Sequence, residues 1–168
     1  MSDRKLLLQT LQDHLVPVIL KDGFEQVPLP KEISSPETKA AFPFGLMRRK
    51  KGRDFELIEI QLDKGGAPKF VVNFGIAPSE GVNLPWGHLA QDKLGVSALP
   101  EAYRLYSSAT FAKWFSPPLI APLSGKESKV QKAVDHAAGL YQEIKVWFAN
   151  RSVGPHMRKF GYPSKSSG

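Results

Sequence analysis

The amino-acid sequence predicts an α+β fold, in which an antiparallel sheet of about four strands packs against N-terminal and C-terminal helices. The first observation is a hairpin over residues 53–77, where adjacent glycines separate two β-rich runs. The second is that apolar residues near both ends of the chain recur at the spacing of a helix. One strand face in the hairpin is entirely apolar and needs a cover, which we expect the helices to provide. That face carries Phe70, Val72, Phe74 and Ile76.

Size and composition favour one globular domain. The chain has 168 residues, of which 42% are hydrophobic and 23% charged. We assign residues 1–150 to a single α+β domain and residues 151–168 to a basic tail that we expect to be mobile. There is no run of about 18 apolar residues, and the absence of cysteine excludes disulfides, thiolate metal sites and cysteine nucleophiles. These features predict a cytoplasmic protein that does not enter a membrane.

Two helices are expected. Within the first, Pro17 lacks an N–H donor and its ring crowds the preceding turn, so we expect a kink or a local break. Gly23 in the left-handed conformation, followed by Phe24, marks the end of this helix. The second helix follows Gly125 and presents a wide apolar stripe toward the sheet. The stripe consists of Val130, Val134, Ala137, Leu140, Tyr141, Ile144, Trp147 and Phe148.

Further strands are expected over residues 41–49, 54–63 and 103–115. In 54–63 the apolar residues occupy both parities, which indicates either a bulge near Leu57 or burial of both faces. Residues 25–39 contain three prolines and are expected to form an irregular surface connection.

The long segment 78–100 follows the hairpin and carries no sustained pattern of its own. A connection of this length is a place to look for function or for a short helix.

Several short motifs are shared with one known family. A leucine-rich helix closing on Leu-Lys-x-x-Gly-Phe precedes strands with a glutamine and a Val-Asn-x-Gly signature, and over residues 7–77 this pattern resembles the bacterial Domain of unknown function 4304 family. The matching positions are Leu20, Lys21, Gly23, Phe24, Phe55, Gln61, Phe70, Val72, Asn73 and Gly75. The chain departs from the family in the extra connection 25–39. The resemblance implies a fold and no activity, since the family has none assigned.

A run of cations at a predicted hairpin tip is the strongest positive feature of the sequence. It consists of Arg48, Arg49, Lys50, Lys51 and Arg53. These side chains are candidates for contact with an anion or a nucleic acid, although a charged turn also keeps a sheet edge soluble. The tail interleaves cations with aromatic residues and either extends the same surface or is merely solvated. Its residues are Arg151, His156, Arg158, Lys159, Phe160 and Tyr162.

Candidate pocket residues lie in the long segment and on the hairpin. Trp86, His88 and Asp92 are close in sequence, and a tryptophan beside a histidine lines a ligand pocket or anchors the loop to the core. Gln61 and Asn73 are each an amide that either hydrogen-bonds across neighbouring strands or lines a cleft.

Motifs for catalysis are not found. Glu56 and Glu59 have opposite parity on a strand, which sends them to opposite faces. There is no phosphate-loop motif, nucleophile elbow or pair of histidines at metal spacing. We therefore expect no catalytic residues, no metal and no cofactor.

Three functions are compatible with these residues. The first is a non-catalytic interaction module that binds an unidentified protein partner through the sheet edge or the long segment. The alternative is a protein that contacts nucleic acid through the tip 48–53. The third is an enzyme with a pocket near 78–100, and no fold settles the choice by itself.

Overall fold

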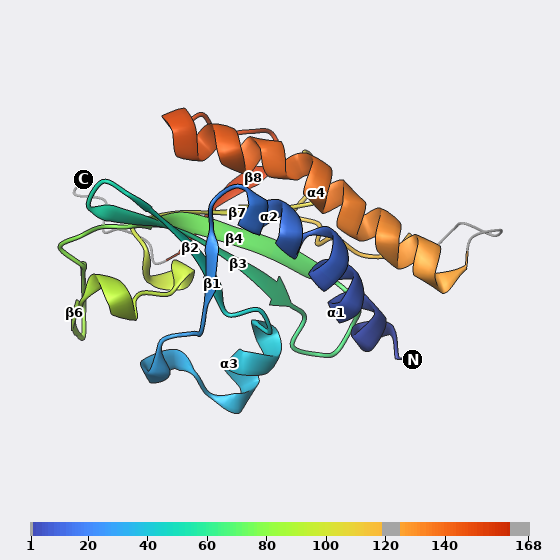
Figure 1. Ribbon diagram of the computed structural model, residues 1–168, viewed down its shortest axis with the longest axis horizontal. Coiled ribbons are helices and arrows are strands. Elements are labelled where there is room, and N and C mark those ends of the chain that lie inside the picture. Colours follow the sequence, from blue (N-terminus) through green and yellow to red (C-terminus); the bar gives the residue numbers. More distant parts are fainter. Residues whose placement is uncertain (1, 119–124, 162–168) are drawn as a thin grey trace.

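A central antiparallel sheet organises the computed structural model, which describes residues 2–118 and 125–161 (Figure 1). In these residues six strands lie in the order β1-β2-β3-β4-β7-β8. Their bounds are β1 Glu25–Val27, β2 Leu46–Lys51, β3 Asp54–Leu62, β4 Phe70–Ala77, β7 Glu101–Leu105 and β8 Met157–Phe160. The fold class is thus α+β, as predicted. The strand number is corrected from about four to six, because the short edge strands β1 and β8 carry too few residues for an alternation to be recognised.

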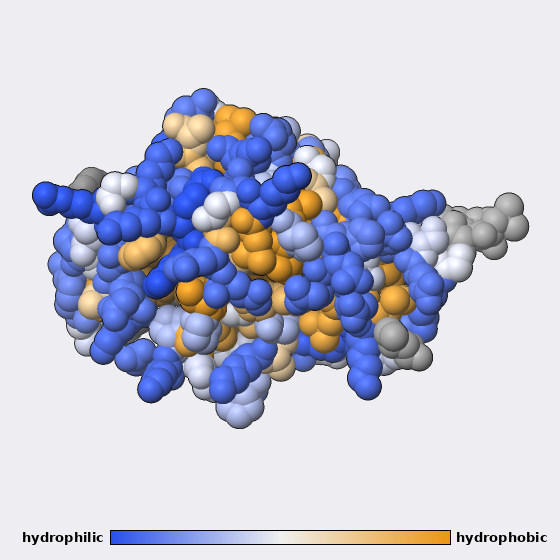
Figure 2. All heavy atoms as spheres, viewed as in Figure 1, coloured by the Kyte–Doolittle hydropathy of each residue, from blue (hydrophilic) through white to orange (hydrophobic). Residues whose placement is uncertain are grey.

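Helices cover one face of this sheet, which we call the helix face (Figure 1). They are α1 Asp3–His14, α2 Val16–Lys21 and α4 Lys126–Asn150, whereas the short α3 Pro36–Ala41 lies in the connection before β2. Trp147 of α4 packs edge-on against Phe74 of β4 at 5.4 Å between ring centroids. Figure 2 shows mostly hydrophilic side chains on the outside, with smaller apolar areas between them. The apolar stripe of α4 is therefore the cover that the sequence predicts for the hairpin.

Local sequence explains the ends of the helices. Ser2 caps α1 by accepting a hydrogen bond from the Lys5 amide at 3.2 Å. Pro17 stands in the first turn of α2, and the chain breaks between the two helices at Leu15, so the expected break is confirmed. Gly23 has a φ of 97°, which confirms the stop signal.

The β3–β4 hairpin pairs without interruption from Phe55 opposite Ala77 to Leu62 opposite Phe70. The two parities in β3 therefore reflect burial of both faces and not a bulge. The second face of the sheet, turned away from the helices, has its own smaller apolar cluster. That cluster contains Leu46, Leu57, Ala77, Leu94, Val96, Leu99 and Ala102.

The segment 78–100 supplies much of this second cluster. It contains the hairpin β5 Val82–Leu84 and β6 Gly87–Leu89, followed by the 3₁₀ turns η2 Gln91–Lys93 and η3 Val96–Ala98. Leu94, Val96 and Leu99 are almost fully buried. These three side chains attach the segment to the sheet, whereas Trp86 is 70% exposed.

Two predicted strands differ from the structure. The strand expected over 41–49 begins only at Leu46, because Ser35 caps α3 and the helix continues to Ala41. The strand expected over 103–115 ends at Leu105, where serine-rich residues fold into a loop closed by the Ser107 amide on the Lys113 carbonyl at 2.8 Å.

The connection 25–39, expected to be irregular, contains β1, the 3₁₀ turn η1 Lys31–Ile33 and the start of α3. The expected mobile tail contains β8, and its residues 162–168 lie outside the described part of the chain.

Candidate anion-binding site

Four polar side chains meet on the second face of the sheet. The register places Glu59 opposite Asn73, and Asn73 opposite Arg104, on three adjacent strands. Gln61 lies two residues along β3 from Glu59 and therefore shares its face. This alternation also sends Glu56 to the helix face, so the predicted separation of the two carboxylates is confirmed.

Hydrogen bonds join the four residues into one cluster. The Asn73 Nδ2 donates to Glu59 Oε1 and to Gln61 Oε1, both at 2.9 Å. Arg104 Nε donates to Asn73 Oδ1 and its Nη2 to Gln61 Oε1, both at 2.7 Å. The cross-strand role predicted for Gln61 and Asn73 is confirmed. Two neutral amide oxygens thus fix the orientation of one cationic guanidinium.

The carboxyl group of Glu59, next to this cluster, is buried and keeps its proton to a higher pH than an exposed carboxyl does. Glu59 is only 3% exposed, and burial raises the pKa of its carboxyl to about 7, against the lowering effects of the Asn73 hydrogen bond and the Arg104 charge. Near neutral pH the carboxyl therefore offsets only part of the Arg104 charge. Within residues 2–118 and 125–161, Arg104 makes no ion pair with a carboxylate inside 4.0 Å.

Cations and aromatic rings alternate across this face, an arrangement that we call the ladder. The Lys69 Nζ lies 5.6 Å from the centroid of a Trp114 ring, and the Arg104 Cζ lies 5.7 Å from it. The Arg104 Cζ also lies 4.0 Å over the Phe160 ring. The ladder of Lys69, Trp114, Arg104 and Phe160 therefore joins the start of β4, the 106–115 loop, β7 and β8.

A cavity of about 650 Å³ adjoins the ladder at Trp114. Its walls include Phe111, Lys113 and His136, together with the hydroxyl groups of several serines. A second cavity, of about 510 Å³, shares residues 116–118 with the first and is lined by Lys69 and Lys129. None of the described residues that line the larger cavity is acidic. Both cavities are also lined by residues of α4, and the second one includes Asp3, the ion-pair partner of Lys126. Trp114 is the residue that the larger cavity shares with the ladder.

Another arginine extends this surface at the sheet edge. Arg158 of β8 pairs with Arg104 in the register, which places both side chains on the second face. Its Nη2 donates to the Thr110 carbonyl at 2.9 Å and so joins β8 to the 106–115 loop. The basic tail predicted from sequence therefore contributes two residues here, Arg158 and Phe160.

The predicted basic tip does not act as one cluster, because strand alternation divides it. Arg48 bonds to Glu25 at 2.9 Å and lies over Phe55 on the second face. Arg49 turns to the helix face. The remaining cations are exposed, although Lys51 Nζ also donates to the Phe148 carbonyl at 3.4 Å. They are Lys50, Lys51 and Arg53.

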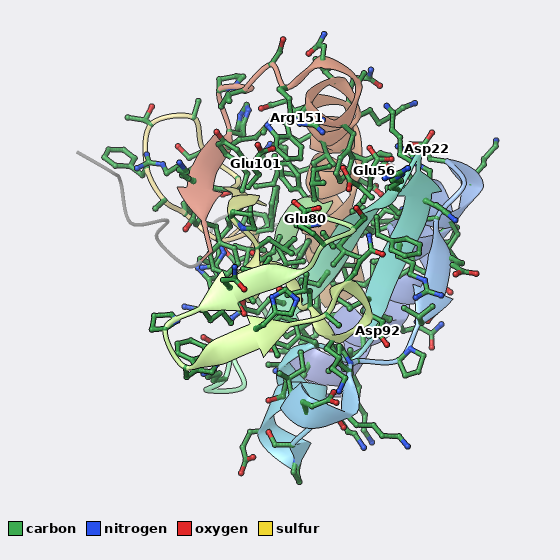
Figure 3. All side chains as sticks on the ribbon, turned by 90° about the vertical axis from the view of Figure 1, so that its left-hand side faces the viewer. Asp22, Glu56, Glu80, Asp92, Glu101 and Arg151 are labelled. Carbon is green, nitrogen blue, oxygen red and sulfur yellow. The ribbon has the colours of Figure 1, made fainter. Side chains whose placement is uncertain are left out.

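Arg49 belongs to a closed network of charges. Its Nε donates to Glu56 Oε1 at 2.8 Å, and its Nη1 bonds to Asp22 Oδ2 at 3.2 Å. Burial lowers the pKa of Arg49, but the Glu56 hydrogen bond and the charges of Glu56 and Asp22 outweigh it and raise that pKa. Tyr141 donates to Asp22 at 2.8 Å, and burial together with this bond raises the pKa of its hydroxyl. Figure 3 shows Asp22 and Glu56 near each other.

The pocket candidates of the long segment lie on different elements. Trp86 and His88 are exposed residues of the β5–β6 hairpin, and His88 Nδ1 lies 2.6 Å from Asn83 Oδ1. Asp92 is in η2 and lines a separate cavity of about 280 Å³ with Arg48. In Figure 3 the hairpin faces the viewer and Asp92 lies apart from Asp22 and Glu56.

The remaining tail candidates pack against α4 and β7. His156 Nδ1 lies 2.5 Å from Glu143 Oε2. Arg151 Nε lies 3.5 Å from Glu101 Oε2, and the two residues are adjacent in Figure 3. Lys159 is exposed on β8, and Tyr162 lies outside the described residues.

The central residues of this candidate site could not be recognised as a group in the sequence. Lys69 precedes Arg104 by 35 residues (104 − 69), and a loop separates Arg104 from Trp114, so no local pattern joins these three residues. A signal existed in β7, where Arg104 has the parity of Ala102 and not that of the apolar Tyr103 and Leu105.

Comparison with known proteins gives no relative: no family model, curated protein or solved structure matches the chain. The resemblance to the Domain of unknown function 4304 family stays a prediction. In the described part of the chain, no helix has the length and apolar composition needed to cross a membrane. The same residues contain no group of three or more histidines and carboxylates placed to hold a metal ion.

Proposed function

We propose that this chain is a non-catalytic binding module that receives an anionic macromolecule on the second face of its sheet. The observation that carries the proposal is Arg104, whose guanidinium is oriented by the neutral amides of Gln61 and Asn73. A guanidinium held in this way keeps its charge available and has already lost the side-chain freedom that binding would otherwise cost.

The surroundings of Arg104 support an anion as the ligand. Lys69, Lys113 and Lys129 line the adjoining cavities, and the whole chain has a formal charge of +7. Asp3 also lines the second cavity, where it pairs with Lys126, so lysines outnumber carboxylates in both linings. An excess of charge of one sign in a cleft raises the local concentration of oppositely charged ligands. Glu59 lies beneath Arg104 and sets how much of this charge is felt at a given pH.

Elution from an immobilised polyanion such as heparin tests the proposal. The variant Arg104→Gln should elute at clearly lower salt than the wild type, because it loses the fixed cation. The matched control is Arg53→Gln, which removes one exposed charge from the tip 48–53. If Arg53→Gln shifts elution and Arg104→Gln does not, the tip is the anion site and the proposal is wrong.

A protein partner bound through the long segment is a second candidate, favoured by the 70% exposure of Trp86 on the β5–β6 hairpin. Tryptophan is enriched among the residues that dominate binding energy at protein interfaces. Affinity capture from the native cell with wild type and with Trp86→Ser tests it. A partner that the variant captures equally well does not bind through the hairpin.

A further inference from the structure

Building on the proposed anion-binding face, we propose that its ligand is a single-stranded nucleic acid. The sugar-phosphate chain follows the cations of the ladder, and an unpaired base enters the cavity between Phe111 and Trp114.

The alternation of cations and rings favours this ligand over an acidic protein segment. Carboxylates need only the charges of Lys69 and Arg104, and Trp114 and Phe160 add nothing to their recognition. Sites for single-stranded nucleic acid combine a positively charged groove with aromatic side chains on which bases stack. The ladder places both kinds of group on one sheet face.

The larger cavity has the properties of a base pocket. Its volume of about 650 Å³ is within the usual range for small-molecule sites. Phe111, at its wall, is 70% exposed, although large apolar side chains are usually buried. The loop that carries Phe111 is held in shape, because Ser108 Oγ accepts hydrogen bonds from the Thr110 and Phe111 amides at 3.1 and 3.2 Å. An exposed ring on a fixed loop is suited to stacking.

The site extends beyond one nucleotide. Trp114 belongs to both the ladder and the larger cavity, and residues 116–118 also line the second cavity with Lys129. The phosphates on either side of a base in the cavity would therefore meet cations in both directions. A duplex keeps its bases paired and stacked and cannot present one to the cavity, which excludes it as the preferred ligand.

Fluorescence anisotropy with a labelled single-stranded oligonucleotide of about 12 nucleotides tests the inference. The same sequence as a duplex and polyglutamate serve as competitors. Phe111→Leu should weaken single-strand binding about tenfold and leave polyglutamate binding unchanged. Trp86→Leu is the matched control, because Trp86 is also 70% exposed but lies on the β5–β6 hairpin. This variant should change neither the affinity for the single strand nor the affinity for polyglutamate.

A second variant guards against a local folding defect in Phe111→Leu. Lys113→Gln removes an exposed cation from the cavity wall and should lower both single-strand affinity and its salt dependence. If polyanions bind through Arg104 but single strands bind no tighter than polyglutamate, or Phe111→Leu has no effect, this inference is overturned and the proposed function stands. If no polyanion binds at about 50 mM salt, the proposed function and this inference are both wrong.

Discussion

Arg49 and Arg104 occupy equivalent positions on opposite faces of the sheet. Each donates from Nε to the residue opposite it on a neighbouring strand, and each lies over a phenylalanine ring, Phe24 at 4.4 Å and Phe160 at 4.0 Å. The acceptor differs: it is the carboxylate of Glu56 for Arg49 and the amide of Asn73 for Arg104.

The difference lies in how much of each arginine's charge is neutralised within the chain. Two carboxylates neutralise Arg49, and that network joins β2 and β3 to α2 and α4 through Asp22 and Tyr141. The Arg104 guanidinium donates hydrogen bonds to the neutral amides of Asn73 and Gln61, but no carboxylate of the described residues forms an ion pair with it. Arg49 is thus paired with carboxylates within the chain, whereas Arg104, for which we propose a binding role, is only oriented by neutral amides.

Removing Arg49 should have the largest effect on stability. Arg49→Ala leaves Glu56 as an unpaired charge that is 1% exposed, and its Oε2 already lacks a hydrogen-bond partner among the described residues. We expect the free energy of unfolding to fall by about 3–5 kcal/mol, measured by urea denaturation. If Arg49→Ala lowers the free energy of unfolding no more than Arg104→Ala does, the two arginines contribute equally to stability and the contrast between them is wrong.

The free energy of unfolding should depend on pH through the buried carboxyl group of Glu59, which accepts a hydrogen bond from Asn73. The pKa of Glu59 is 4.5 in the unfolded chain and about 7 in the folded one. Between these values only the folded state keeps the proton, so the free energy of unfolding falls as pH rises through this window, by about 3 kcal/mol in all. Below and above the window Glu59 adds no slope.

Urea unfolding at about pH 5 and about pH 8 measures this change. Glu59→Gln has no titrating group and should lose the part of the slope that Glu59 causes. Equal slopes in the two proteins would mean that Glu59 is ionised throughout and that Arg104 is neutralised as Arg49 is.

Gln61→Glu should give Arg104 a carboxylate partner, as Glu56 is for Arg49. Gln61 Oε1 accepts from both Asn73 and Arg104, so a carboxylate preserves these bonds and adds the missing negative charge. We expect polyanion affinity to fall about tenfold, or about 1.4 kcal/mol, with stability nearly unchanged. Competition anisotropy and urea unfolding measure the two quantities, and undiminished affinity would place the anion elsewhere.

The smallest effect should come from the ion pair of Arg48, which lies on β2 beside Arg49. Its partner Glu25 has a 65% exposed side chain, and exposed ion pairs contribute about 0–1 kcal/mol. Glu25→Gln should therefore change the free energy of unfolding by less than about 1 kcal/mol. A larger loss would mean that an ion pair of these arginines contributes to the free energy of unfolding whether or not it is buried.

Features set by local chemistry could be predicted from the sequence. The hairpin 53–77, the break before Pro17 and the stop at Gly23 each depend on neighbouring residues. The edge strands could not be predicted, because β1 and β8 acquire their conformation from pairing with β2 and β7.

The site follows the same division. Gln61 and Asn73 could be identified because a polar pair on neighbouring strands is visible in a hairpin. Arg104, Trp114 and Lys69 meet only after three strands and a loop have assembled, and no spacing along the chain shows that. The cations of the tip 48–53 are neighbours in sequence, but strand alternation sends Arg48 and Arg49 to opposite faces of the sheet.

The late position of α4 in the chain bears on how the protein emerges from the ribosome. Phe70 and Phe74 are synthesised well before Trp147, which covers the same side of the sheet. Until α4 has been translated, the apolar face of the β3–β4 hairpin in the nascent chain lacks the helix that covers it in the folded protein. We therefore expect chaperones to engage this intermediate, and slow translation ahead of residue 126 to increase aggregation.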